Sequence, residues 1–330
     1  MVIALESTLV LIIKPIVIFA FVLGIVPIIL WAERKLLGRF QSRLGPNRVG
    51  FKGLLQPAAD VLKLLSKESS TPETAVPWMM AIAPVISIVT AVATLAIIPW
   101  GPVGAWGGNL GLYGIDVSIG ILYFFAFGSL AFYGLMLGGW SSGSKYSFLG
   151  AMRAAAQLIS YEVALGLSLL GVVMTAGSMS LVTIVEQQDG IWFIVPQFVG
   201  FCIFMVAGFA ETARAPFDLP EGDAEIVGGY NTEFGGMRFG SFFMAEYMEI
   251  LIISGIGAAC FFGGWHGPGP IALAPLWMLL KIVLGALFFI WVRASMPRLR
   301  YDQLMSFGWK ILLPLATLNV LVTAIVLVEL

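Results

Sequence analysis

The chain has 330 residues, of which 59% are hydrophobic and 11% are charged, and its mean hydropathy is +0.95. A soluble domain carries roughly twice that charged fraction, so the composition excludes this class. The apolar residues form long continuous runs rather than the short alternating segments of a β-barrel, and they indicate an all-α polytopic membrane protein. The net charge of -1 gives no bulk attraction to nucleic acid, which we do not expect as a partner.

Eight apolar segments are long enough to cross a bilayer, which takes about 20 residues. They are Thr8–Trp31, Pro77–Ile98, Val117–Leu137, Leu158–Ala176, Ile191–Phe209, Phe239–Phe262, Ala272–Trp291 and Phe307–Val328. Pro314 interrupts the last segment, but neighbouring helices can satisfy the freed carbonyl in a membrane. The sequence therefore predicts a single membrane domain over residues 1–330, with about eight transmembrane helices.

The cations are strongly biased toward alternate connections between these segments. Of the 18 Lys and Arg residues, 16 lie in or beside the odd-numbered connections. The positive-inside rule then predicts that these connections are cytoplasmic and that both termini lie outside. We expect a bacterial inner membrane in preference to an organelle membrane. Lys14 and Lys281 lie within apolar runs, and Lys14 either snorkels outward or pairs with a carboxylate.

The first cytoplasmic connection, residues 32–76, contains an amphipathic pattern between Leu54 and Lys67. Its helical periodicity separates an apolar stripe from a polar face, and Pro57 suits a first turn. The helix is too short to span a bilayer, so we expect it at the membrane interface. It is either a generic surface helix or the cover of a cavity. The cations upstream of it can bind anionic lipid, an acidic partner protein or an anionic ligand.

The fifth connection, residues 210–238, is rich in acidic residues and contains Arg214 among them. Such acids repel one another, so we expect some of them to have raised pKa values. Pro216 and Pro220 stiffen the loop, and apolar side chains alternate with the acids, which favours a loop packed into protein over a solvated one. The acids are Glu211, Asp218, Glu221, Asp223, Glu225 and Glu233.

Three further acids, Glu162, Glu246 and Glu249, lie within the apolar segments. Each would cost roughly 2.5–3.5 kcal/mol at the membrane centre, so we expect none of them to face lipid. Glu246 and Glu249 share a helix face, and the neighbouring Tyr161 and Tyr247 can donate hydrogen bonds. The acids form either structural ion pairs or a proton relay, and the scarcity of intramembrane cations favours the relay.

Residues that could hold a redox cofactor are scarce. Cys202 and Cys260 both lie in apolar segments, and an iron–sulfur cluster needs about four ligands. His266 is the one histidine, so bis-His haem ligation is excluded. We expect this chain to hold no metal and no redox cofactor of its own.

Two stretches resemble one family closely. The run from Glu33 to Glu68, with Gly53-Leu-Leu-Gln-Pro-Ala-Ala-Asp-Val-Leu-Lys at its centre, resembles the first signature of the H subunit of NADH-quinone oxidoreductase. This subunit is the bacterial counterpart of mitochondrial subunit one of respiratory complex I. The run Ala210-Glu-Thr-Ala-Arg-Ala-Pro-Phe-Asp-Leu-Pro-Glu-Gly-Asp-Ala-Glu225 resembles the second signature. The similarity covers essentially the whole chain.

The resemblance implies two groups of functional residues. The first matches positions near a quinone chamber or its entrance, and consists of Glu33, Arg34, Asp60, Arg293 and Arg298. The second matches an acidic proton path from the chamber into the membrane, and consists of Glu162, Glu211, Asp218, Glu221, Asp223, Glu225, Glu233 and Glu246. The family usually has Glu at the position of Asp223, so the carboxylate there is shorter by one methylene.

The resemblance also implies the setting of the chain within a proton-pumping NADH:quinone oxidoreductase. Quinone is the substrate, while the iron–sulfur clusters, FMN and NADH belong to partner subunits. Those partners are peripheral subunits that close the chamber, an iron–sulfur subunit, small membrane subunits and antiporter-like subunits, in contact with the lipid bilayer. Two alternatives are a membrane anchor of an energy-converting hydrogenase and a stand-alone ion or solute transporter.

Overall fold

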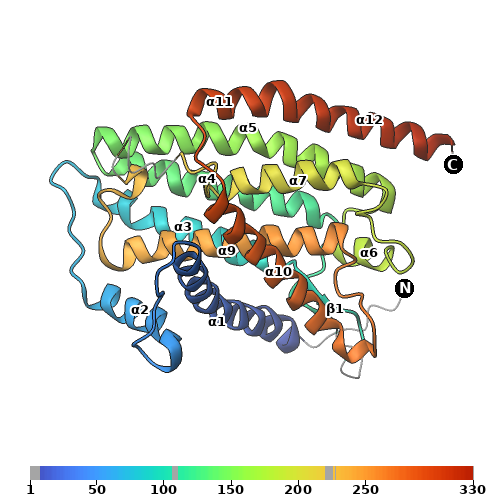
Figure 1. Ribbon diagram of the computed structural model, residues 1–330, viewed down its shortest axis with the longest axis horizontal. Coiled ribbons are helices and arrows are strands. Elements are labelled where there is room, and N and C mark those ends of the chain that lie inside the picture. Colours follow the sequence, from blue (N-terminus) through green and yellow to red (C-terminus); the bar gives the residue numbers. More distant parts are fainter. Residues whose placement is uncertain (1–7, 106–110, 220–225, 227, 330) are drawn as a thin grey trace.

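The computed structural model describes residues 8–105, 111–219, 226 and 228–329 (Figure 1). Most of this is helical, which confirms the predicted all-α membrane fold. The helices are α1 (Thr8–Phe40), α2 (Gln56–Ser66), α3 (Pro77–Leu95), α4 (Gly120–Ser141), α5 (Lys145–Ala176), α6 (Leu181–Glu186), α7 (Phe198–Glu211), α9 (Gly236–Phe261), α10 (Ala274–Ser295), α11 (Tyr301–Phe307) and α12 (Leu313–Glu329). Two short strands, β1 (Pro99–Gly101) and β2 (Leu112–Tyr113), form an antiparallel hairpin that the sequence did not predict.

The helices are stacked in layers across the bundle. In Figure 1, α5 and α12 lie along the top, α4 and α7 beneath them, α3 and α9 through the middle, and α1 and α10 below. The α9 helix is the central element, because 17 of its 26 residues are buried. Acidic side chains on this helix are therefore held inside protein rather than against lipid.

Seven helices of the described part are long and apolar enough to cross a membrane. The fifth predicted span, Ile191–Phe209, is the exception, because α7 has only 14 residues and begins after Pro196. At about 1.5 Å per residue, α7 is roughly 21 Å long and too short for the hydrocarbon core alone. The non-helical residues before it are held by the buried Gln188, whose amide oxygen accepts from the backbone N–H groups of Phe193 and Gly263 at 3.1 and 3.0 Å.

The last predicted span, Phe307–Val328, contains a change of helix type. A π-helical turn, Gly308–Leu312, joins α11 to α12 just before Pro314. Pro314 has no backbone N–H and cannot complete the regular α-helical ladder, so the wider turn accommodates it. The Tyr161 hydroxyl donates to the carbonyl of Leu304 at 2.9 Å and fixes this junction to α5.

The predicted amphipathic helix is present as α2, with Pro57 in its first turn. It projects from the lower left of Figure 1 together with the first connection. Its apolar residues are exposed on the isolated chain, with Leu62 at 67% and Leu65 at 60%. An apolar stripe of this kind needs lipid or a partner subunit to cover it.

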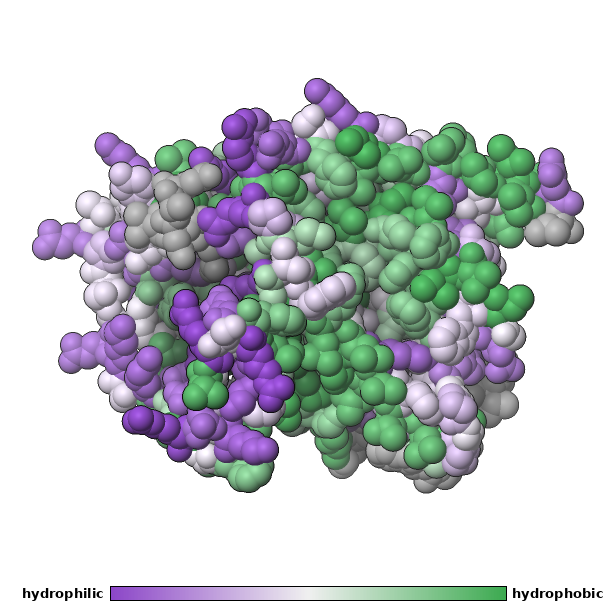
Figure 2. All heavy atoms as spheres, viewed as in Figure 1, coloured by the Kyte–Doolittle hydropathy of each residue, from purple (hydrophilic) through white to green (hydrophobic). Residues whose placement is uncertain are grey.

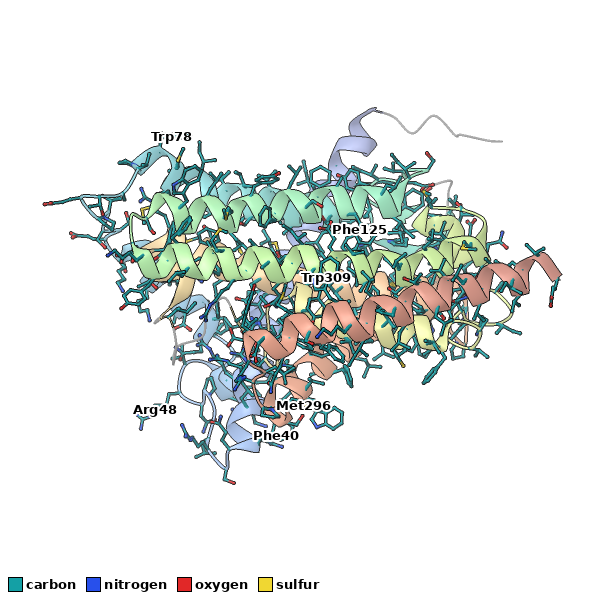
Figure 3. All side chains as sticks on the ribbon, turned by 90° about the horizontal axis from the view of Figure 1, so that it is seen from above. Phe40, Arg48, Trp78, Phe125, Met296 and Trp309 are labelled. Carbon is teal, nitrogen blue, oxygen red and sulfur yellow. The ribbon has the colours of Figure 1, made fainter. Side chains whose placement is uncertain are left out.

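Hydrophilic residues gather at the α2 end of the molecule, whereas apolar residues cover most of the remaining face in Figure 2. Figure 3 shows Phe40, Arg48 and Met296 toward the end of the molecule from which α2 projects. At the opposite end, Lys281 donates to the carbonyls of Phe262, Gly264 and His266, each at 2.7 Å. This intramembrane cation therefore has three backbone acceptors in place of a carboxylate.

Glycine allows α4 to approach its neighbours closely. A Cβ added at Gly139 would lie 2.6 Å from the carbonyl oxygen of Ser147 in α5, and one at Gly134 would lie 3.0 Å from that of Ala83 in α3. Helices in membranes associate through such small-residue contacts because lipid supplies no hydrophobic drive between them. The position of α4 against α3 and α5 therefore depends on these two glycines.

We predict that Gly139→Ala destabilises the chain by about 1–3 kcal/mol, because its methyl group overpacks the α4–α5 contact. Gly24→Ala is the matched control, because a Cβ at Gly24 in α1 meets no atom within 4 Å. That substitution should be neutral or slightly stabilising. Thermal stability of the assembled complex, followed by size-exclusion chromatography, checks both variants. Equal melting temperatures for the two variants would contradict the packing argument.

Candidate functional site: a buried ion-pair network and two acid-lined cavities

Glu33 is the centre of a buried ion-pair network near the C-terminal end of α1. Its side chain is only 3% exposed. One carboxylate oxygen pairs with Arg293 from α10 and, at 3.2 Å, with Arg214 from the loop after α7. The other oxygen accepts a hydrogen bond from the Tyr247 hydroxyl of α9 at 2.5 Å. Four parts of the chain, distant in sequence, therefore converge on one carboxylate.

Arg214 joins Glu33 to a second carboxylate. Its Nε atom lies 2.5 Å from Glu246 of α9, and its guanidinium lies 4.4 Å from the centre of the Tyr247 ring. Burial would lower the pKa of Arg214, but the Glu246, Tyr247 and Glu33 groups raise it, and the net pKa is above the ordinary value. Arg214 is thus a permanent cation shared by two acids that would otherwise repel each other.

The network continues outward through Asp218 and Arg298. Arg298 donates to Asp218 at 2.6 Å. Burial raises the pKa of Asp218, while the guanidinium of Arg298 opposes this by lowering it. Leu299 donates its backbone N–H to the carbonyl of Pro216 at 3.1 Å, so the fifth and seventh connections are joined directly beside this pair.

A separate pair connects α1 to the amphipathic helix. Arg34 pairs with Asp60 of α2, and the same carboxylate accepts from the Gln56 amide at 3.2 Å. Both charged side chains are partly exposed. Arg34 therefore holds α2 beside the end of α1 while its neighbour Glu33 points into the bundle.

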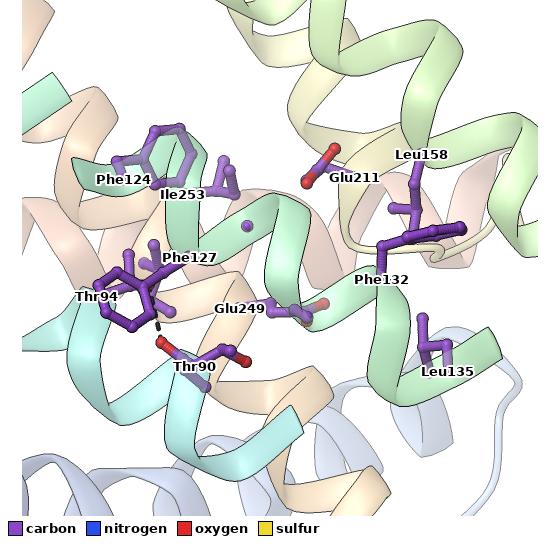
Figure 4. A pocket seen from close by; sticks show the side chains of 14 residues that line it. Thr90, Thr94, Phe124, Phe127, Phe132, Leu135, Leu158, Glu211, Glu249 and Ile253 are labelled. Atoms are coloured by element: carbon purple, nitrogen blue, oxygen red, sulfur yellow. Dashed lines mark hydrogen bonds between the residues drawn. The ribbon is translucent and has the colours of Figure 1, made fainter. Parts of the chain in front are cut away.

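Two small cavities extend from the network into the bundle. The first, of about 30 Å³, is lined by Glu246, Glu249 and Glu211 together with Gln157 and Ser87. The second, of about 40 Å³, shares Glu211 and Glu249 and continues past threonines of α3 and phenylalanines of α4 (Figure 4). Figure 4 places Glu211, at the end of α7, and Glu249, from α9, on two sides of this second cavity.

The cavity walls present polar atoms without protein partners. Glu211 Oε2 and Gln157 Oε1 are both buried, and neither has a hydrogen-bond partner among the described residues. A water molecule needs roughly 10–15 Å³ of such space and two to four polar partners. Each cavity is therefore large and polar enough to hold water between acids.

Glu162 lies on the other side of α4 from these cavities. Its carboxylate accepts from Ser129 of α4 at 2.5 Å, and it lines an open groove of about 490 Å³ between α4 and α5. A Cβ added at the adjacent Gly128 would be 3.8 Å from Glu211 Oε1. The Gly128–Ser129 step of α4 thus stands between Glu211 and Glu162.

The predicted site residues do not form one cluster. Arg34 and Asp60 form the separate pair, Glu211 lines both cavities, and Glu162 lines the groove between α4 and α5. Glu33, Arg293, Arg298, Asp218 and Glu246 are in the network or its extension. Among the described residues, Glu233 takes part in none of these ion pairs and lines neither cavity. The predicted positions Glu221, Asp223 and Glu225 lie outside the described residues.

The site predictions missed two residues that the geometry makes prominent. Arg214 was noted only as the cation of the fifth connection, although its isolation among acids could have marked it as their shared partner. Glu249 was seen as an intramembrane acid but was not placed on the proton path.

The hydrogen bonds of the two tyrosines also differ from those expected, because Tyr247 donates to Glu33 and Tyr161 donates to the carbonyl of Leu304. Adjacent residues on a helix face different directions, so neither tyrosine hydroxyl donates to the glutamate next to it in sequence.

No group of three or more His, Cys, Asp or Glu side chains within the described ranges is arranged to hold a metal ion. Cys260 is buried, Cys202 is exposed on α7, and both are free thiols. The acids, arginines and tyrosine of the network support ion pairing and proton exchange.

Comparisons with known proteins agree along nearly the whole chain. A family model described as NADH dehydrogenase matches residues 13–324. The second of the NADH-quinone oxidoreductase H subunits of Syntrophobacter fumaroxidans is 50% identical over 317 residues, which cover 96% of this chain and 95% of that protein. The H subunit of Syntrophotalea carbinolica is 52% identical over 296 residues, which cover 89% of this chain and 88% of that protein. The chain belongs to the NADH dehydrogenase family, as an H subunit of NADH-quinone oxidoreductase, a membrane component of respiratory complex I.

Proposed function

We propose that this chain forms the membrane side of a quinone chamber and carries protons from that chamber into the membrane. The observation that supports this most directly is the sharing of Arg214 between Glu33 and Glu246. Glu33 and Arg293 lie toward the projecting cytoplasmic end, and Glu246 lines the first cavity. One guanidinium thus links the proposed chamber to the proposed proton path.

Quinone reduction supplies the driving event. Reducing a quinone to a quinol takes two electrons and two protons, and we assign the electrons to iron–sulfur, FMN and NADH chemistry on partner subunits. Arg293 and Arg298 stabilise negative charge that develops on the quinone before its protons arrive. When an acid of the network gives up or gains a proton, the charges that Arg214 balances change, and the proton affinity of Glu246 changes with them.

The proton path then runs from Glu246 through the cavities to Glu211 and Glu249, and from there past Ser129 to Glu162. Waters in the two cavities bridge the acids, since their walls present unpartnered oxygen atoms. Glu162 faces an open groove, where it can pass a proton laterally to a neighbouring membrane subunit. Moving one charge against 100 mV costs about 2.3 kcal/mol, so each charge change in the network must supply at least that free energy.

We predict that Glu211→Gln and Glu249→Gln each lower proton translocation by about 10²-fold, because an amide cannot exchange the proton. Glu186→Gln is the control, since Glu186 is exposed at the end of α6 and lines neither cavity. Translocation and quinone reduction are measured together in vesicles that contain the intact complex. Wild-type pumping in both cavity variants would rule out the path.

Arg214→Met should abolish quinone reduction and destabilise the chain by about 3–5 kcal/mol, because two buried carboxylates lose their shared cation. Arg214→Lys keeps the charge but cannot reproduce the planar fork of donors that reaches both acids. It should retain more stability than Arg214→Met while remaining impaired in quinone reduction. Full activity in Arg214→Lys would show that only the charge is needed there.

Asp218 makes quinone reduction sensitive to pH. Burial raises the pKa of Asp218 and Arg298 lowers it, so Arg298→Gln should raise that pKa further. The carboxylate then becomes protonated at a higher pH, and the acidic fall in quinone reductase activity should begin at a higher pH than in the wild type. In Asp218→Asn this fall should be absent. Superimposable pH profiles for the wild type and both variants would remove Asp218 from the mechanism.

A further inference from the structure

Three glutamine side chains are buried within the described part of the bundle, and they are Gln157, Gln188 and Gln197. The amide oxygens of Gln188 and Gln197 both accept hydrogen bonds from N–H groups of the protein. The oxygen of Gln157 has no such donor among the described residues. A buried amide oxygen normally has a hydrogen-bond partner, so Gln157 differs from the other two in needing one that these residues do not supply.

The orientation of the Gln157 amide is fixed by two backbone carbonyls. Its nitrogen donates to the carbonyl of Ala210, in the last turn of α7, at 2.7 Å and to that of Phe217 at 2.8 Å. A carbonyl can only accept, so the amide nitrogen must face these two oxygens and the amide oxygen must face away from them. Gln157 also bridges the two ends of the segment 210–217, which contains Arg214.

The first cavity, which Gln157 lines, has room for the missing donor. Its volume of about 30 Å³ is enough for about two waters at roughly 10–15 Å³ each. The lining also includes Glu211, whose Oε2 atom is likewise buried and without a partner among the described residues. The hydroxyls of Ser87 and Thr212, in the same lining, donate to backbone carbonyls instead. Since a water molecule has two hydrogens to donate, one water can satisfy both oxygens.

We propose that Gln157 is a positioning residue of the first cavity, whose amide oxygen binds and orients the water through which Glu246 and Glu211 exchange a proton. This inference rests on the proton path proposed above. The water donates one hydrogen to Gln157, which leaves its other hydrogen for Glu211 and a lone pair for the proton of Glu246. One O–H bond breaks at Glu246 and one forms at Glu211, so the water is regenerated.

The same amide connects this water to the ion-pair network. Gln157 is bonded to both ends of the segment that contains Arg214, so a shift of that segment moves the amide oxygen and the water that it holds. The amide oxygen accepts hydrogen bonds but does not exchange a proton, which suits it to orient the water without interrupting the path.

The intact complex in vesicles tests this role through Gln157→Met, which keeps the length and unbranched shape of the side chain but lacks the amide oxygen. Proton translocation per quinone reduced should fall about two- to tenfold, the effect of one lost hydrogen bond. Gln188→Met is the matched control, because Gln188 is equally buried and also donates to two backbone carbonyls but lines neither cavity. It should lose stability while retaining the wild-type translocation ratio.

A water signal separates this role from a merely structural one. Redox-induced infrared difference spectra of the wild-type complex should contain a water O–H stretching band that shifts when the solvent is exchanged for heavy-oxygen water. The band should be lost in Gln157→Met and kept in Gln188→Met, since only the first variant removes the oxygen to which the water donates. An experimental structure of the wild-type complex should place an ordered water within about 3 Å of Gln157 Oε1.

The outcomes distinguish a failure of this inference from a failure of the proposed path. Wild-type translocation and an unchanged water band in Gln157→Met would overturn the role of Gln157, and the path would stand if Glu211→Gln and Glu249→Gln fail to pump. Wild-type pumping in both acid variants would instead overturn the path, and this proposal with it. A protonated glutamic acid bonded directly to Gln157 Oε1 in the wild-type structure would also overturn the proposal, whether or not the variants assemble.

Discussion

The arrangement of the site depends on one buried cation held between two buried acids. Arg214 comes from a connection rather than a helix, yet it lies inside the bundle because Glu33 and Glu246 both pair with it. Burying Arg214 is costly unless it has partners, and it pairs with Glu246 as well as with Glu33, which Arg293 also contacts. Because α1, α9, α10 and the fifth connection all contribute to this network, a change of charge within it acts on four separate parts of the fold.

An ion-pair network that depends on one shared cation is well suited to coupling two processes. A rigid hydrophobic core transmits packing changes, but an ion-pair network also responds to a single proton, since every member changes the proton affinity of the others. The two cavities beyond Glu246 are small, so they limit the number of waters that can enter while keeping Glu211 and Glu249 in reach of one another. In the function proposed above, quinone chemistry at one end of this arrangement changes the charges at the other.

Sequence reasoning predicted the helical membrane fold and α2, because apolar run length and helical periodicity are local properties. It failed at α7, where Pro196 delays the helix and the side chain of Gln188 replaces helical hydrogen bonds. The short β1–β2 hairpin was not predicted from the sequence either. The acids were found because charge in an apolar segment is conspicuous. Their partners were not, since the contact of Arg214 with Glu33 joins residues 181 positions apart, and no pattern in the chain encodes that distance.

The most direct test of the account is to observe carboxyl protonation while quinone is reduced. Redox-induced infrared difference spectra of the intact complex should contain a protonated-carboxyl band that is lost in Glu246→Gln and altered in Glu249→Gln, with no change in Glu186→Gln. The same band in all four proteins would contradict the account, because quinone reduction would then leave the charges around Arg214 and along the cavities unchanged.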